Sequence, residues 1–134
     1  MSYMLDTNIC IYAIKNKPEQ VLQRLKSNLE SGLCISAITL AELELGVEKS
    51  ARPRQNAVAL MQFLSILNVL PFTDLAAVEY GKLCAYLQGK GAPVGTMDML
   101  IAAHAKAENA VIITNNVKEF ERVPDLKIEN WTEQ

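Results

Sequence analysis

The chain has 134 residues, of which 50% are hydrophobic and 21% are charged, and this composition excludes a disordered, collagen-like or coiled-coil protein. Thirteen Lys and Arg against fifteen Asp and Glu give a net charge of -2, whereas nucleic-acid binders usually carry a positive balance. The three cysteines lie far apart and His104 is the single histidine, so a Cys/His zinc site is excluded and any metal must be held by oxygen. No segment resembles a leader peptide or reaches the length of a membrane span, which favours a cytoplasmic protein without a membrane partner.

Short apolar runs alternate with longer segments of helical periodicity along the whole chain. The runs are too short for helices and predict buried parallel strands, because they are continuously apolar instead of alternating. Loop-like composition appears only around residues 50–55 and 89–95, so we expect one domain over residues 1–134. This order predicts a three-layer α/β/α sandwich around a central parallel sheet of four or five strands. In chain order, the expected strands lie at 3–5, 33–35, 68–70, 111–113 and 126–128. The expected helices lie between them, at 18–28, 56–66, 74–88 and 97–108.

Polar residues follow several of the predicted strands, at the edge where an open α/β sheet binds its ligand. Asp6 ends the first strand, and the second strand leads into a segment that contains Glu42. Asp98 opens the most apolar predicted helix, between two methionines. Because like charges repel, carboxylates gathered at one edge either share a proton or bind a hard cation such as Mg²⁺. Such a site is suited to phosphoryl chemistry.

Each of these residues also has a local structural interpretation as a helix cap. Asp6 or Thr7 can cap the helix that follows the first strand. Residues 39–42 read Thr-Leu-Ala-Glu, a capping box, and for Glu42 alone capping is the favoured interpretation. The same reasoning makes Asp98 a first-turn acid behind an N-cap at Thr96, and makes Asn116 to Glu119 a further capping signature.

Four segments together resemble the PIN-domain ribonucleases, and among them the VapC toxins of type II toxin-antitoxin systems. They are MLDTNICIY near the start, SAITLAELELGV in the first third, GKGAPVGTMDMLIAAHA in the centre and ITNNVKEFERVPDLKIENW at the end. Their order and spacing span the full chain. The resemblance implies the PIN-like form of the α/β/α fold described above.

The resemblance also implies which residues form the site. The family's acids fall on Asp6, Glu42 and Asp98, which are expected to hold the metal and to act in catalysis. Its fourth acidic position falls on Asn116, an amide in place of an acid, and Glu119 one helical turn later is the alternative oxygen donor. Thr7 and Thr114 are expected to support the site with their hydroxyl groups.

The implied activity is that of a Mg²⁺- or Mn²⁺-dependent endoribonuclease that cuts structured RNA and leaves a 5′-phosphate and a 3′-hydroxyl. The implied substrate is tRNA cut in the anticodon region, with initiator tRNA as the first candidate, so that translation stops. The implied partners are a cognate VapB antitoxin, which neutralises the toxin in a hetero-oligomer, and a second copy of the chain in a homodimer.

RNA binding must be reconciled with an acidic chain. Without the three proposed acids the net charge of -2 becomes +1, and basic residues flank the predicted site. Such phosphate contacts position RNA without reading its sequence. We expect His104 to be a structural residue, because it lies on the apolar face of its helix about two turns beyond Asp98. The basic candidates for RNA contact are Lys15, Lys49, Arg52 and Lys90, with Lys17 and Arg54 beside them.

Two other function classes also fit parts of the pattern. A non-catalytic module that binds RNA or protein would use the same acids to dock an arginine of its partner, and the amide at Asn116 favours this alternative. A receiver-like signalling domain also places an aspartate after a strand, but the paired acids expected after its first strand are missing. The second alternative is therefore the weaker of the two.

Overall fold

The computed structural model describes residues 2–91 and 94–133, in which five parallel strands form one sheet in the order β3-β2-β1-β4-β5. Four strands occupy the predicted positions, β2 being one residue longer. The last strand begins two residues later than predicted, because Asp125 has a φ of 60° and pairing with β4 starts only at Ile128. The strands are β1 (Tyr3–Leu5), β2 (Leu33–Ser36), β3 (Asn68–Leu70), β4 (Val111–Ile113) and β5 (Ile128–Glu129).

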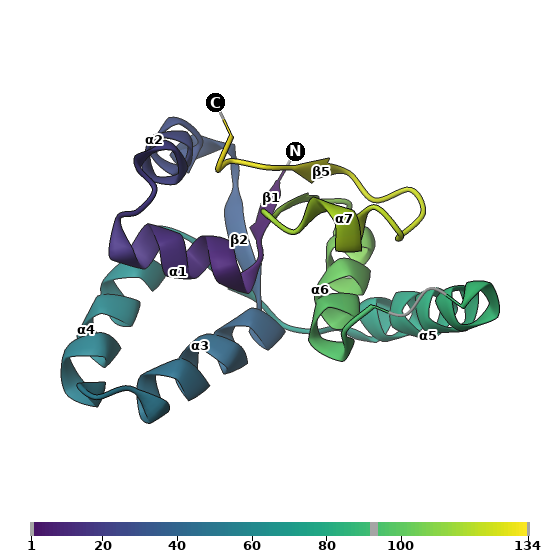
Figure 1. Cartoon of the computed structure of the whole chain (residues 1–134), viewed down its shortest axis with the longest axis horizontal. Helices are drawn as coiled ribbons and strands as arrows, with labels where there is room; N and C mark the ends of the chain where they lie inside the picture. Colours follow the sequence, from purple (N-terminus) through teal and green to yellow (C-terminus); the bar gives the residue numbers. More distant parts are fainter. Residues whose placement is uncertain (1, 92–93, 134) are drawn as a thin grey trace.

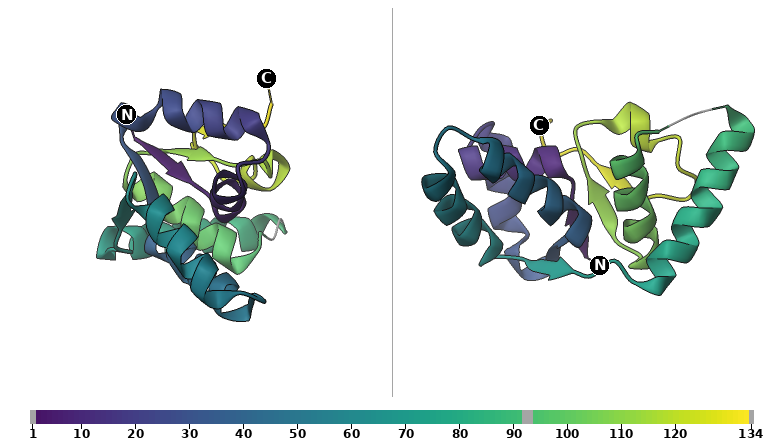
Figure 2. Two further views of the ribbon diagram at one scale, coloured as in Figure 1. Left: turned by 90° about the vertical axis from the view of Figure 1, so that its left-hand side faces the viewer. Right: turned by 90° about the horizontal axis from the view of Figure 1, so that it is seen from below.

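Helices cover both faces of this sheet, which confirms the predicted three-layer α/β/α architecture. Figure 1 shows α1 to α4 on one side of the strands and α5 to α7 on the other. The right-hand view in Figure 2, seen from below, shows the same division. The α-helices are α1 (Thr7–Lys15), α2 (Glu19–Ser27), α3 (Ala37–Lys49), α4 (Pro53–Leu64), α5 (Asp74–Lys90), α6 (Thr96–Ala107) and α7 (Val117–Phe120), with a 3-10 turn, η1, at Leu29–Ser31.

The two loop-like stretches are shorter than their composition predicted. Helix α4 begins at Pro53, three residues before the expected start, since proline is well suited to the first helical position, where its missing N–H costs nothing. Helix α5 continues to Lys90 and ends at Gly91, whose φ of 63° is the left-handed conformation that glycine adopts easily. The rest of the second predicted loop includes residues 92–93, which lie outside the described residues.

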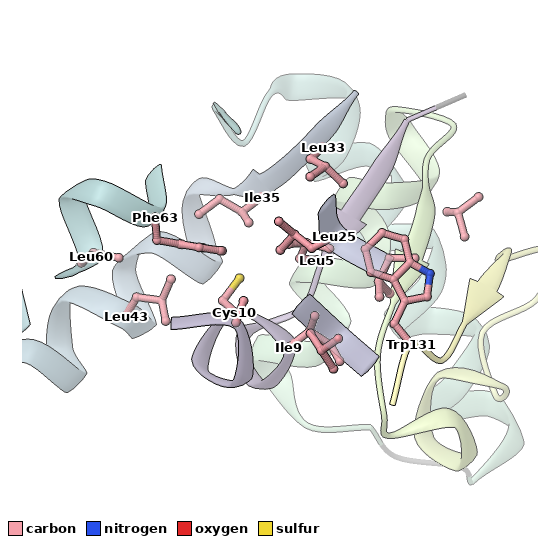
Figure 3. Packing of buried hydrophobic residues seen from close by; sticks show 14 residues of the cluster. Leu5, Ile9, Cys10, Leu25, Leu33, Ile35, Leu43, Leu60, Phe63 and Trp131 are labelled. Atoms are coloured by element: carbon pink, nitrogen blue, oxygen red, sulfur yellow. The ribbon is translucent and has the colours of Figure 1, made fainter. Parts of the chain in front are cut away.

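Alternate residues of the central strands supply two separate hydrophobic cores. Leu5, Ile35 and Ile113 point to the side of α1 to α4, where Trp131 is also fully buried (Figure 3). Met4 and Ile112 point to the side of α5 and α6. Because both faces are covered, the strands read as continuous apolar runs.

Two helix starts differ from the capping predictions. Ser36 ends β2 and caps α3, since its hydroxyl accepts a hydrogen bond from the backbone N–H of Ile38. The capping-box interpretation of Thr39 and Glu42 is therefore wrong: Thr39 lies buried inside the first turn. Helix α6 likewise begins one residue earlier than expected, with Gly95 and not Thr96 as its N-cap.

The strand order places a topological switch point at the carboxyl end of β1. From β1 the chain builds outward through β2 and β3, and it then crosses back to build β4 and β5 on the other side. Loops diverge at such a point and leave a crevice, which is where open α/β sheets bind ligands. None of the helices in the described ranges is long and apolar enough to cross a membrane.

Candidate active site

Asp6 follows β1 directly and lies at the switch point, with only 4% of its surface exposed. It caps α1 as predicted: its Oδ1 accepts a hydrogen bond of 2.9 Å from the backbone N–H of Ile9. The hydroxyl of Thr114, which follows β4, also hydrogen-bonds its carboxyl. Burial nevertheless outweighs these donors and, with the nearby charge of Glu42, raises the pKa of Asp6 above its ordinary value. Capping and a functional role therefore coexist in one carboxylate.

Glu42 lies in the second turn of α3 and its carboxylate meets α1. The Thr7 hydroxyl donates a hydrogen bond of 2.5 Å to Glu42 Oε1, which links two helices 35 residues apart in the sequence. This contact replaces the local one that the capping box predicted. Thr7 is the residue after Asp6, so one short segment positions both carboxylates.

Asp98 in α6 and Glu119 in α7 form a hydrogen-bonded carboxyl pair. Burial, the hydrogen bond to Glu119 and the charges of Glu119, Asp6 and Glu42 raise the pKa of Asp98 to about 7. The pKa of Glu119 is shifted in the opposite direction. Burial raises it, but hydrogen bonds from Asp98, Gly95 and Asn116 outweigh burial and lower it. Of the two carboxyl groups, Asp98 is therefore the one that holds the proton, and its O–H donates the hydrogen bond to Glu119.

Glu119 is positioned by two further donors. The backbone N–H of Gly95 lies 2.8 Å from Oε1, and the Asn116 amide Nδ2 lies 2.5 Å from Oε2. Asn116 itself is fixed by its backbone N–H, which donates to the Thr114 hydroxyl at 2.9 Å. The amide at the family's fourth acidic position thus orients a glutamate one turn further on.

The structure brings Asp6, Glu42, Asp98 and Glu119 into one electrostatic cluster, since Asp6, Glu42 and Glu119 all act on the pKa of Asp98. Within residues 2–91 and 94–133, no three His, Cys, Asp or Glu side chains already stand as a tight metal-ligating group. The oxygen donor set and the raised pKa values of Asp6 and Asp98 suit a hard divalent cation, which would offset the mutual repulsion. To hold one, the carboxylates must turn from their present donors toward a common centre.

The basic residues named from the sequence are all exposed. Lys15 ends α1, and together with Glu42 it lines a cavity of about 330 Å³ between α1, α3 and α4. Lys49 ends α3 and Arg52 precedes α4, at the end of α3 away from β2. Lys90 lies at the end of α5, where its Nζ is 5.7 Å from the centroid of the Tyr86 ring. Of the four, Lys15 shares a cavity with a site carboxylate.

Sequence reasoning missed the contacts that hold the acids in place. The backbone N–H of Gly95 contacts Glu119, and the hydroxyl of Ser36 contacts His104. No local motif predicts either long-range partner. A signal was available for Ser36, because a serine between a buried strand and a helix is a common N-cap. His104 is fully buried and hydrogen-bonded to Ser36, which confirms the prediction of a structural histidine.

An all-parallel α/β sheet with clustered acids at its switch point is suited to the metal-assisted phosphoryl chemistry of a nuclease, and the comparisons with known proteins agree with this class. Residues 3–126 match the family described as PIN domain. The chain is 47% identical over 131 residues to the tRNA(fMet)-specific endonuclease VapC of Salmonella typhimurium, with 98% of each chain covered. It is also 47% identical over 132 residues to Ribonuclease VapC2 of Rickettsia felis, again with 98% of each covered.

Solved structures show the same relationship. The crystal structure of VapBC2 from Rickettsia felis bound to a promoter DNA fragment matches with a TM-score of 0.94 and 46% identity, over 98% of this chain and 99% of that one. The DNA-bound VapBC structure from Salmonella typhimurium matches with a TM-score of 0.93 and 47% identity, over 98% of both chains. The chain belongs to the PIN-domain family, in its VapC ribonuclease branch. PIN-domain nucleases generally use divalent metal ions.

Proposed function

We propose that this chain is a Mg²⁺- or Mn²⁺-dependent endoribonuclease that cuts tRNA in its anticodon region, with initiator tRNA as its substrate. The observation that carries the proposal is the clustering of Asp6, Glu42 and Glu119 near Asp98, whose pKa rises to about 7. The relatives from Salmonella typhimurium and Shigella flexneri, 47% and 45% identical, are named as tRNA(fMet)-specific endonucleases, which supports this substrate.

Asp6, Glu42 and Asp98 would hold the cation, and Asn116 and Glu119 would complete the site. The bound cation would supply the positive charge that polarises the scissile phosphate and lowers the pKa of an attacking water. Its entry requires the proton shared by Asp98 and Glu119 to leave. Thr7 and Thr114 restrain the Glu42 and Asp6 carboxylates through their hydroxyl groups. The protein thus contributes aligned oxygens and a group that exchanges a proton near neutral pH.

The test is cleavage of total tRNA by the purified chain with Mg²⁺ or Mn²⁺, followed by sequencing of the new 5′ ends. We expect one dominant 5′-phosphate end within the anticodon region of initiator tRNA. Cleavage spread evenly over many tRNAs would contradict the substrate. An absence of cutting with either metal, or full cutting by Asp98→Ala, would contradict the nuclease mechanism and favour a non-catalytic binding module.

We further propose that a VapB antitoxin neutralises the chain and that the toxin acts as a homodimer in a toxin-antitoxin assembly. The related solved structures are VapBC complexes, which supports such a partner. The pocket acids favour an arginine or lysine of the antitoxin, which would displace the cation. The cavity of about 330 Å³ beside Glu42 has apolar walls that include Ile14, Leu43 and Val47, and these suit apolar side chains of the same segment. Undiminished Mn²⁺ binding by the purified complex would contradict this mode of neutralisation.

A further inference from the structure

His104 is a fully buried histidine that joins α6 to the start of α3. Its Nδ1 lies 2.7 Å from the Ser36 hydroxyl, across 68 residues of sequence. Ser36 ends β2 and caps α3, and its Oγ already accepts a hydrogen bond of 3.0 Å from the backbone N–H of Ile38. A hydroxyl that accepts one bond still has its own proton to donate. The hydroxyl proton of Ser36 is therefore available to Nδ1, and this arrangement satisfies the hydroxyl as both acceptor and donor.

The ring is neutral and is enclosed by the connection between β3 and α5. Burial lowers the pKa of His104, and the charge of Glu108 and the backbone carbonyl of Pro71 offset only part of this effect. The Phe72 ring packs edge-on against the imidazole, with 5.4 Å between the ring centroids. Nε2 is buried and makes no hydrogen bond of good geometry within the described ranges. The specific polar contact of the side chain is consequently the one with Ser36.

Equal spacing connects this contact to the acids of the site. Glu42 lies six residues after Ser36 on α3, and Asp98 lies six residues before His104 on α6. Six residues of helix rise about 9 Å, so each acid lies the same distance along its helix from the Ser36–His104 contact. Helices α3 and α6 contact each other, and the charge of Glu42 acts on Asp98. The hydrogen bond lies at the start of α3 and near the end of α6, whereas Glu42 lies in the second turn of α3 and Asp98 in the first turn of α6.

We propose that His104 is a positioning residue, whose hydrogen bond to Ser36 sets the register of α6 against α3 so that Asp98 faces Glu42. Sliding one helix past the other by a single residue would move its acid about 1.5 Å along the axis, which is enough to spoil a shared cation site. The inference rests on the proposed metal-dependent function, because the role of His104 is to position the acids of the proposed cation site and not to bind RNA.

The decisive experiment is calorimetric titration of Mn²⁺ into the purified chain and its variants, at a temperature where all of them are folded. His104→Leu keeps an apolar side chain of similar size without a hydrogen bond, and we expect it to weaken Mn²⁺ binding about 5- to 10-fold, somewhat less than the loss of a direct ligand partner. His104→Asn places an amide oxygen where Nδ1 was, so it should recover most of the affinity. If His104→Leu does not fold, His104→Gln takes its place. The Gln side chain is one methylene longer than Asn, so we expect its amide to miss the Ser36 hydroxyl and the hydrogen bond to be lost.

A matched control separates positioning from general stability. Leu87 is buried in the same hydrophobic core on α5, and Leu87→Ala removes packing without touching the contact between α3 and α6. Leu87→Ala should lower the melting temperature and leave Mn²⁺ affinity unchanged. Equal Mn²⁺ affinity in wild type and His104→Leu, or equal losses in His104→Leu and Leu87→Ala, would overturn the positioning role alone. Failure of the wild-type chain to bind Mn²⁺ would instead overturn the proposed metal site and this inference with it.

Discussion

The two sides of the acidic cluster hold their carboxylates by different means. On the side of α1 and α3, Asp6 and Glu42 accept hydrogen bonds from neutral donors, namely a backbone N–H and two threonine hydroxyls. On the side of α6 and α7, Asp98 and Glu119 bond to each other. Neutral donors leave a carboxylate charged, whereas a carboxyl pair must keep a proton. We call the first side the fixed side, because separate donors hold its two carboxylates in place, and the second the titrating side, because Asp98 has a pKa of about 7.

The largest expected effect comes from the fixed side, where Asp6 caps a helix and also faces the pocket. Asparagine caps helices as well as aspartate does, but it lacks the charge. We expect Asp6→Asn to lose about a thousand-fold in tRNA cleavage while its stability stays within about 0.5 kcal/mol. Asp6→Ala should lose the same activity and a further ~1 kcal/mol of unfolding free energy. Cleavage assays and urea unfolding measure the two effects, and an active Asp6→Asn variant would reduce Asp6 to a cap.

Glu42→Gln tests the fixed side without the complication of capping. The amide can still accept the hydrogen bond from Thr7, so thermal unfolding should change little. Cleavage should fall about a hundred-fold, because one negative ligand of the proposed cation is neutralised. Surviving cleavage together with a melting temperature as low as that of a core cavity variant would show that Glu42 has only a structural role.

The titrating side predicts a pH dependence of stability. Asp98 has a folded-state pKa of about 7, against 3.8 for the free side chain, so the folded chain binds more protons than the unfolded chain between these values. Stability contributed by this group is present below pH 4 and is lost as the pH rises through 7. Solvent screening limits the loss to about 1–2 kcal/mol between pH 5 and pH 8.

Glu119→Gln should reduce this dependence without abolishing it, because the substitution removes the charge of Glu119 and lets an amide donate to Asp98, while the burial that raises the pKa of Asp98 remains. Thermal unfolding between pH 5 and pH 8, in the presence of a chelator, measures the change. Asp125→Asn is a suitable control, since Asp125 is an exposed acid in the turn before β5. An identical pH profile in wild type and Glu119→Gln would show that the two sides of the pocket do not differ in this way.

The smallest expected effect concerns RNA binding next to the fixed side. Lys15 shares a cavity with Glu42, and Lys15→Gln should raise KM about 3-fold with kcat unchanged. The slope of log affinity against log salt should fall by about 0.7–0.9, as one phosphate contact is lost. Lys106→Gln is the control, because Lys106 lies in the last turn of α6, at the end opposite Asp98. Equal salt slopes in both variants would exclude a phosphate contact at Lys15.

The sequence by itself determined the layered parallel fold and singled out Asp6, Glu42 and Asp98, which the structure brings near one another. Continuous apolar runs of three or four residues are a local property, so β1, β2, β3 and β4 could be predicted closely. The later start of β5 could not, because it depends on where a turn allows pairing with β4. Asp6 was correctly predicted as a cap, because a cap and its donor lie three residues apart.

Only the tertiary structure decided what surrounds each acid. The capping-box pattern predicted that Glu42 would bond to the start of its own helix. Ser36 caps that helix instead, and the hydroxyl of Thr7 in α1 donates a hydrogen bond to Glu42. Likewise, 21 residues separate Asp98 from Glu119, and no periodicity links them. Charge state and register depend on such long-range contacts, which form only when the strands bring distant segments to one edge of the sheet.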